Sequence, residues 1–433
     1  MFVVRRRRIE LGEENAASQL RLSSARRRID AFIEQIDVLA ASSFPHDDGR
    51  AALAAIRKHC KDLQADLDLP VGVRTDVVDH LCLNLLDKVD KFTAILGFIL
   101  RSTNVRNPFE LHYIVKKLVS RALDGDVSLL ISSEWTYVPF TYPMSVDQLP
   151  DAILIGTPAP ESGNPLLIPL AGHEVGHSAW RMYGCSPLYA RMANQAVKEE
   201  IDRNKEAGKA LLEAAPLKAL DKDRVINQCA GHVMEQLEEI FCDLFGLYLF
   251  GYGFIAAFDY LLGPGGHVRG LDYPSDDQRM AILVEAAGDK VEGALDLRLD
   301  AAMAAHWTVA APSLADKAGA EIVDAVTRSM VPQVRTDLFA RLQSLGINPP
   351  QQHVIDNVLQ AFERGEPYPE RVELGEIVSA GWHRLRALDL APCRGADEEE
   401  KRGNRSKSYK VLADLVLKTI EVAEYHDRIA GHA

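Results

Sequence analysis

The chain has 433 residues, which exceeds the roughly 100 to 200 of a single domain, so its length predicts two or three structural units. Hydrophobic residues make up 47% and charged residues 26%, a balance typical of folded proteins and not of disordered or fibrous ones. Because 62 Asp and Glu outnumber 49 Lys and Arg, the net charge of −13 argues against broad attraction to nucleic acid or anionic lipid.

Cysteine usage and hydropathy predict a cytoplasmic protein. The six cysteines are scattered and form no C-x-x-C pair, which is typical of a reducing compartment. The arginines at 5–8 follow the first apolar residues and precede no apolar run, so the start does not resemble a secretory signal. The most apolar stretch, Leu244 to Phe258, is shorter than a bilayer span. We therefore expect neither a membrane span nor a nucleic-acid partner.

Residues 1–125 are predicted to form a helical N-terminal region. Apolar side chains recur there at spacings of three and four, for example at Ile29, Ile33 and Ile36. The arginine clusters at 5–8 and 26–28 have acidic residues nearby, so we interpret them as solvated helix faces.

Residues 126–290 are predicted to form a core that begins with a small sheet. Its expected strands are Val127 to Ser132, Trp135 to Tyr142 and Ala152 to Gly156. Asn164 and Pro165 are typical of a helix N-cap and first helical residue, and Pro169 delays the regular helix by one turn.

The third predicted region, residues 291–433, continues the helical pattern. Breaks are expected at 348–350, at 365–369 and at 395–407, the last as an exposed loop. The predicted fold class is therefore mainly α with a small β-sheet (α+β).

The helix expected after Pro169 contains the pattern H-E-x-x-H, formed by His173, Glu174 and His177. Residues four apart share a helix face at about 6 Å, which suits two imidazoles on one Zn²⁺. Glu174 lies about 100° round the helix, where it can take a proton from a metal-activated water as general base. Since these polar groups are costly to bury in an apolar helix without a partner, the motif favours a zinc site.

A third metal ligand is expected between Met234 and Gly246, where Glu235, Glu239 and Asp243 follow at successive i, i+4 positions. Glu239 can bind the metal while Asp243 accepts the second N–H of a ligating histidine. In the competing assignment, Glu235 is the metal ligand and Glu239 is the residue that supports the ligands from one turn further along the helix. Asp243 lies among apolar residues, so it needs a specific partner in either assignment.

The two motifs together resemble the gluzincin metallopeptidases, and within them the CAAX-type endopeptidase group with its bacterial heat-shock relatives. The segment from Tyr273 to Arg279 has the spacing of that group's His-Pro-x-x-x-x-Arg segment, with Tyr in place of His. The resemblance covers roughly residues 153–283 and implies a zincin-like metallopeptidase core. It carries over the zinc ligands His173, His177 and Glu239, the general base Glu174, and Asp243 behind the ligands. Members of that group are membrane-embedded, whereas the sequence of this chain shows no stretch long enough for a bilayer span. The membrane substrates of the group are therefore not carried over to this chain.

The oxyanion of a hydrolytic intermediate needs a donor besides the metal, and Tyr273, His267 and Arg279 are the candidate catalytic residues for this role. Two have alternatives: Arg279 as an ion-pair partner of Asp243 or another acidic residue, and His267 as a solvent-exposed residue of a Gly-rich turn. His232 precedes the acidic residues at 235, 239 and 243. It has two alternatives, approach to the site or simple packing, and packing is the favoured expectation.

These patterns predict a zinc-dependent endopeptidase that acts on protein or peptide substrates. Its helical flanks would gate the cleft or dock a regulatory protein partner. Two alternatives stay open: a binding or regulatory module with a structural zinc, and a metallohydrolase of non-peptide amides or esters.

Overall fold

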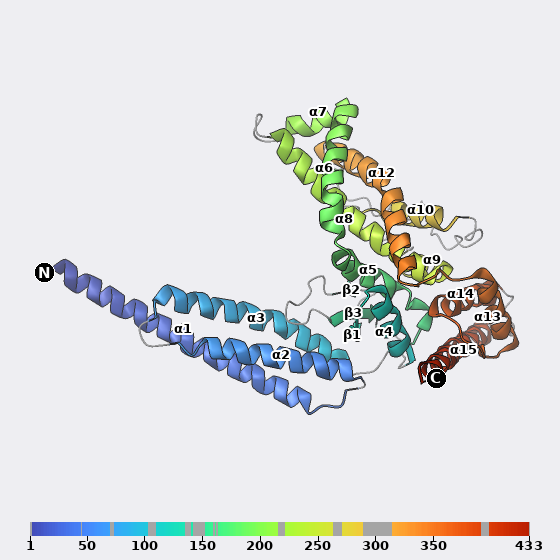
Figure 1. Cartoon of the computed structure of the whole chain (residues 1–433), viewed down its shortest axis with the longest axis horizontal. Coiled ribbons are helices and arrows are strands. Elements are labelled where there is room, and N and C mark those ends of the chain that lie inside the picture. Colours follow the sequence, from blue (N-terminus) through green and yellow to red (C-terminus); the bar gives the residue numbers. More distant parts are fainter. Residues whose placement is uncertain are drawn as a thin grey trace. The chain divides into compact units, whose positions relative to one another are not determined.

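The computed structural model describes residues 2–44, 46–69, 73–102, 110–134, 140–141, 152–158, 161, 163–214, 221–262, 271–288, 314–390 and 398–432. It is mainly helical with a small sheet, which confirms the predicted fold class (Figure 1). The strands are β1 (Ser128–Glu134), β2 (Phe140–Thr141) and β3 (Ala152–Pro158), each within or overlapping a predicted run.

The first of two compact units contains three long helices and part of the sheet. These helices, α1 (Phe2–Ala40), α2 (Asp47–Asp66) and α3 (Thr75–Ser102), pack side by side (Figure 1). Their apolar faces meet in a core, and β1 and β3 are neighbouring strands. Asp48 accepts a hydrogen bond from the Leu129 amide at 3.0 Å, which ties α2 to β1. Arginines 26–28 are exposed, as predicted for a solvated helix face.

The second unit contains α4 (Glu110–Ala122), β2 and the chain from residue 157 onward. Its remaining helical elements are η2 (Pro165–Leu167), α5 (Leu170–Met182), α6 (Cys185–Arg203), α7 (Lys205–Ala214), α8 (Asp221–Phe250), α9 (Tyr252–Leu262), α10 (Asp276–Ala287), α12 (Leu314–Ser344), α13 (Gln352–Arg364), α14 (Leu374–Leu390) and α15 (Glu398–His432).

The predicted division at 125 and 290 does not coincide with these two units. Helix α4 belongs to the second unit, and the helices after residue 313 pack on those before residue 290. In particular, α12 packs against α8, α6 and α7, and α14 packs against α9 and α15. The C-terminal helices therefore share a unit with α5 and α8.

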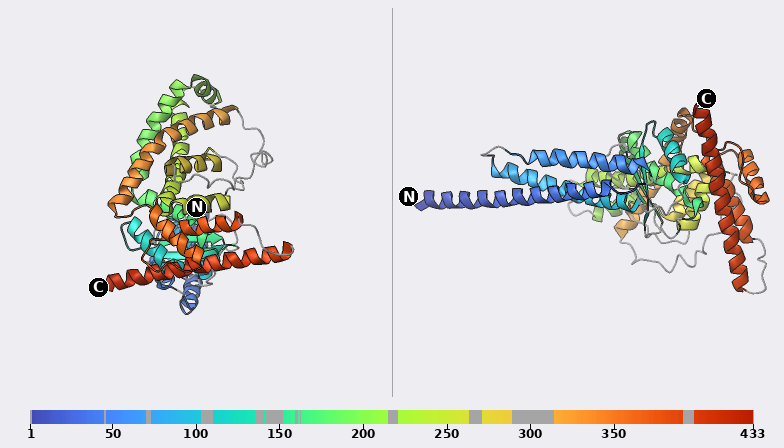
Figure 2. Two further views of the ribbon diagram at one scale, coloured as in Figure 1. Left: turned by 90° about the vertical axis from the view of Figure 1, so that its right-hand side faces the viewer. Right: turned by 90° about the horizontal axis from the view of Figure 1, so that it is seen from below.

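The C-terminal helices confirm two of the three predicted breaks. Interhelical segments follow Ser344 and Arg364, where Pro349 and Gly365 interrupt the helical pattern. The third expectation is wrong from Glu398 onward, because this charged segment begins the single long helix α15 (Figure 2). Its Glu, Lys and Arg residues are good helix formers, which outweighs their polarity.

The apolar run Leu244 to Phe258 is divided between two helices. Gly251, with φ of 55°, adopts a left-handed conformation that favours glycine, and it separates α8 from α9. Across the described residues, no helix combines the length and apolarity that crossing a bilayer requires.

The entry to α5 follows the predicted capping pattern. The Asn164 side chain accepts a hydrogen bond from the Leu166 amide at 3.1 Å, and Pro165 is the first residue of η2. The regular helix begins only at Leu170, after Pro169. This cap fixes the direction in which the chain enters α5.

Replacing Asn164 by Ala removes this acceptor, and we expect the free energy of unfolding to fall by about 1 kcal/mol. Chemical denaturation measures the change. Asn227→Ala is the matched control, since Asn227 is exposed within α8 and caps no helix. Equal stabilities for the two variants would contradict the capping role.

Candidate metal centre

The two histidines of H-E-x-x-H lie on one face of α5, as predicted. Their rings are nearly perpendicular, with centroids 5.1 Å apart. Val175 and Ala179, on the opposite side of the helix, are buried. Burial of this apolar face holds the two imidazoles toward α8.

Glycines allow α5 to approach α8 very closely. A Cβ atom at Gly176 would lie only 2.7 Å from the Cys242 Cα, and one at Gly172 would lie 3.1 Å from the Gly246 Cα. Real Cβ atoms do not tolerate the first distance, so any larger residue at 176 must push the helices apart. This close approach brings the carboxylates of α8 within reach of both histidines.

Glu239 of α8 faces both imidazoles. Its Oε2 lies 3.4 Å from His173 Nε2, and its Oε1 lies 3.8 Å from His177 Nε2. Ligands at 2.0–2.1 Å from a tetrahedral zinc are separated by about 3.4 Å, so these spacings fit a shared ion. Among the described residues Glu239 Oε2 is buried without a hydrogen-bond partner, and a cation would satisfy it.

Two further carboxylates bind the other ring nitrogens of the histidines. His173 Nδ1 lies 2.8 Å from Asp243 Oδ1, and His177 Nδ1 lies 2.9 Å from Glu238 Oε1. Since carboxylates only accept, each Nδ1 carries the donated hydrogen, and each Nε2 is directed toward Glu239. Once His173 has lost its second proton, the arrangement can present two imidazole nitrogens and one carboxylate to a metal.

Arg279 of α10 compensates the buried charge of Asp243. Its Nε and Nη2 donate to the two Asp243 oxygens, both at 2.7 Å, and the two side chains are 2% and 1% exposed. Its Nη1 donates to the Tyr273 hydroxyl. The guanidinium carbon lies 5.0 Å from the ring centroids of Phe258 and Tyr273. Of the two roles considered for Arg279, the geometry corresponds to the ion pair.

The competing assignment for the third ligand is wrong. The Glu235 side chain is 59% exposed and pairs with His232 at 3.4 Å, away from His173 and His177. His232 thus has polar partners and does not simply pack. The remaining oxyanion candidate, His267, lies outside the described residues, and Tyr273 is held beside Arg279.

Glu238 is the residue that the sequence interpretation missed. The adjacent Glu238 and Glu239 gave no way to decide which of them faces solvent. Its role follows from requiring an Nδ1 partner for each ligating histidine, because Asp243 can serve only His173.

Cys242 is a second donor near the histidines, since its Sγ and one nitrogen of each ring lie within 4.8 Å of one another. We favour Glu239 as the ligand. The Cys242 side chain packs against Gly176 and is fully buried. This burial raises the pKa of the thiol well above its usual value. Glu239, in contrast, has a buried Oε2 that lacks a hydrogen-bond partner among the described residues.

The charges of the centre are coupled. Burial lowers the pKa of His173, but the carboxylates of Asp243 and Glu239 outweigh it and raise the pKa to about 10. Burial raises the pKa of Asp243, and the Arg279 charge and hydrogen bonds bring it below its usual range. Burial also raises the pKa of Glu174, against the charges of His173 and His177. A metal must therefore displace a proton from His173 when it binds.

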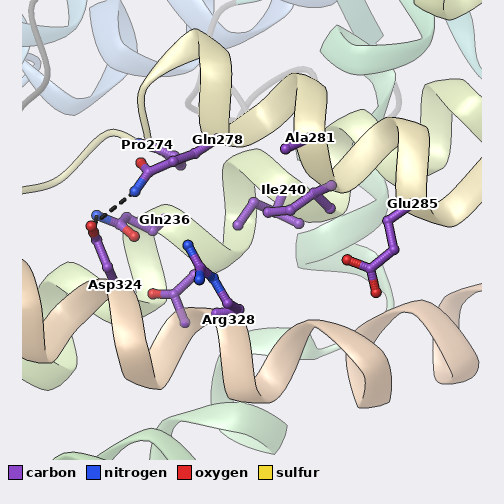
Figure 3. Close-up of a pocket in the computed structure, with 10 residues that line it drawn as sticks. Gln236, Ile240, Pro274, Gln278, Ala281, Glu285, Asp324 and Arg328 are labelled. Carbon is purple, nitrogen blue, oxygen red and sulfur yellow. Dashed lines mark hydrogen bonds between the residues drawn. The ribbon is translucent and has the colours of Figure 1, made fainter.

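A pocket of 410 Å³ lies along a neighbouring face of α8, between α10 and α12 (Figure 3). Gln278 donates to Asp324 Oδ2 at 2.8 Å, which links α10 to α12. Gln236 donates to the Leu271 carbonyl at 2.9 Å, which links α8 to the segment before α10. None of the residues predicted for the metal centre lines this pocket.

No protein-family model, curated protein or solved structure matches this chain.

We expect Gly176→Ala to lower the free energy of unfolding by about 1–3 kcal/mol, because its Cβ collides with the α8 backbone. The widened gap should also weaken zinc retention, measured by elemental analysis after dialysis. Gly231→Ala is the matched control, since nothing lies within 4 Å of a Cβ there. A Gly176→Ala protein as stable and as metal-loaded as this control would contradict the close approach.

We expect Arg279→Met to lower the free energy of unfolding by about 3–5 kcal/mol, because Asp243 is left buried without its counter-charge. Thermal and urea denaturation measure the loss. Arg364→Met is the control, because the Arg364–Glu366 pair is 58% and 62% exposed, and such pairs contribute about 0–1 kcal/mol. Similar losses in both variants would show that the buried pair has no special role.

Proposed function

We propose that this chain is a zinc-dependent endopeptidase of the gluzincin type. The observation that carries the proposal is the convergence of His173 Nε2, His177 Nε2 and the Glu239 carboxylate at ligand spacing. Three protein donors leave a tetrahedral ion one further position, the arrangement of catalytic and not of structural zinc. The donor side chains are 12%, 18% and 15% exposed, so the ion would be within reach of solvent.

When bound, zinc supplies a Lewis acid that polarises a carbonyl and lowers the pKa of water. Glu174, next to His173 on α5, takes the proton of the attacking water and returns it to the leaving amine. Asp243 and Glu238 hold the ring orientations of the two histidines during these transfers. Arg279 keeps Asp243 ionised, so that its carboxylate continues to accept from His173.

Of the three proposed oxyanion donors, Tyr273 is assigned this role because Arg279 is bound to Asp243. The Tyr273 hydroxyl accepts from Arg279 and is hydrogen-bonded to the Glu239 carboxylate, which places it beside the proposed ligands. Burial raises its pKa, which keeps the phenol protonated as a donor requires. A cytoplasmic location, a protein or peptide substrate and a regulatory partner stay predictions from the sequence.

The alternative of a structural zinc is favoured by one observation, the proximity of Cys242 to both histidines. With Cys242 as a fourth ligand the site would be closed to water. Cys242→Ala separates the two cases: it leaves zinc content and cleavage intact in the peptidase, whereas it releases the metal from a structural site.

We expect purified protein to contain one tightly bound zinc ion and Glu174→Gln to retain it while cleavage falls by about 10²–10⁴-fold. Cleavage is measured by mass spectrometry on a library of unstructured peptides, and zinc by elemental analysis. Glu363→Gln, on the exposed surface of α13, is the control and should cleave like the parent. Unchanged cleavage in Glu174→Gln would refute the mechanism, and cleavage of amide or ester probes but not of peptides would favour a non-peptide hydrolase.

A further inference from the structure

A second cluster of metal-ligating groups lies on α8, before the candidate centre. His232 and Glu235 are three residues apart on this helix, and Asp272 comes from the segment that precedes α10. One nitrogen of His232 and one oxygen of each carboxylate lie within 4.8 Å of one another. His232 Nδ1 is 3.4 Å from Glu235 Oε2 and also contacts Asp272 Oδ1.

The charges of this cluster do not balance. His232 supplies at most one positive charge against two carboxylates, and its Nδ1 hydrogen cannot satisfy both of them well. Among the described residues, neither Glu235 nor Asp272 forms an ion pair with a Lys or Arg. A divalent cation beside a neutral imidazole would neutralise both carboxylates.

We propose that His232, Glu235 and Asp272 form a second site for a divalent transition-metal ion such as Zn²⁺. One imidazole nitrogen and two carboxylate oxygens are suitable ligands for this class of ion. The carboxylate side chains are 59% and 64% exposed, so water completes the coordination and the ion exchanges readily. The site therefore binds metal more weakly than the buried centre formed by His173, His177 and Glu239.

The position of Asp272 gives this ion a structural effect. Gln236 already holds the neighbouring Leu271 carbonyl to α8 at 2.9 Å. A metal shared by α8 and Asp272 adds a second link, directly before Tyr273. Because Tyr273 contacts Arg279, which in turn holds Asp243, the ion would restrain the chain that braces the first centre. This inference does not depend on the proposed peptidase activity.

The test is a zinc titration of metal-stripped protein by equilibrium dialysis with elemental analysis. We expect two ions per parent chain, one tight and one weaker. His232→Asn should weaken the second ion at least tenfold and leave the first in place, whereas Glu239→Gln should lose the tight ion and keep the weaker one. His353→Asn, an exposed histidine of α13, is the matched control and should still bind two.

A parent protein whose only bound ion is lost in Glu239→Gln, or one in which His232→Asn weakens no bound ion, would overturn the proposal. Asp272→Asn provides an independent variant if His232→Asn unfolds, which far-ultraviolet circular dichroism detects. Hydrogen exchange adds a second readout in the Glu239→Gln background. Zinc should slow exchange of the Leu271–Tyr273 amides there, and adding His232→Asn should abolish the effect. If only the centre formed by His173, His177 and Glu239 binds no zinc, the parent and Glu239→Gln will bind the same single ion in this titration.

Discussion

The close contact between α5 and α8 determines every other feature of the candidate centre. At Gly176 the two backbones lie so near that a single methyl group would touch the Cys242 Cα. Only at this separation can short carboxylate side chains of α8 reach both ring nitrogens of histidines on α5. The glycine therefore matters to the chemistry although it has no reactive group, because it sets the distance between the groups that do.

Burying several ionisable groups in one place is costly unless each charge has a partner. Here the partners form a continuous series: Glu239 faces the imidazoles, Asp243 accepts from His173, and Arg279 binds Asp243 through two hydrogen bonds. Among the described residues, Glu239 Oε2 is buried and has no hydrogen-bond partner, so the series of partners is incomplete at this atom. A cation bound there would complete it. Helices α10 and α12 support the series from outside through the links made by Gln278 and Gln236.

Local features were predictable from the sequence because they depend on neighbouring residues. Asn164, Pro165 and Pro169 determine how α5 starts, and the i, i+4 spacing places both histidines on one face. The choice of Glu239 over Glu235 depends instead on how α8 is rotated against α5, which no local pattern encodes. The role of Glu238 was missed for the same reason. The division into units was likewise not encoded locally, since packing of α12 on α8 is a long-range contact between separately helical segments.

Arg279 has a further consequence for how a polypeptide could be recognised. Its Nε, Nη1 and Nη2 all have partners, and only 2% of its side chain reaches solvent. The carboxylate of a bound ligand would find this guanidinium already neutralised. Its recognition would therefore need a different positive group.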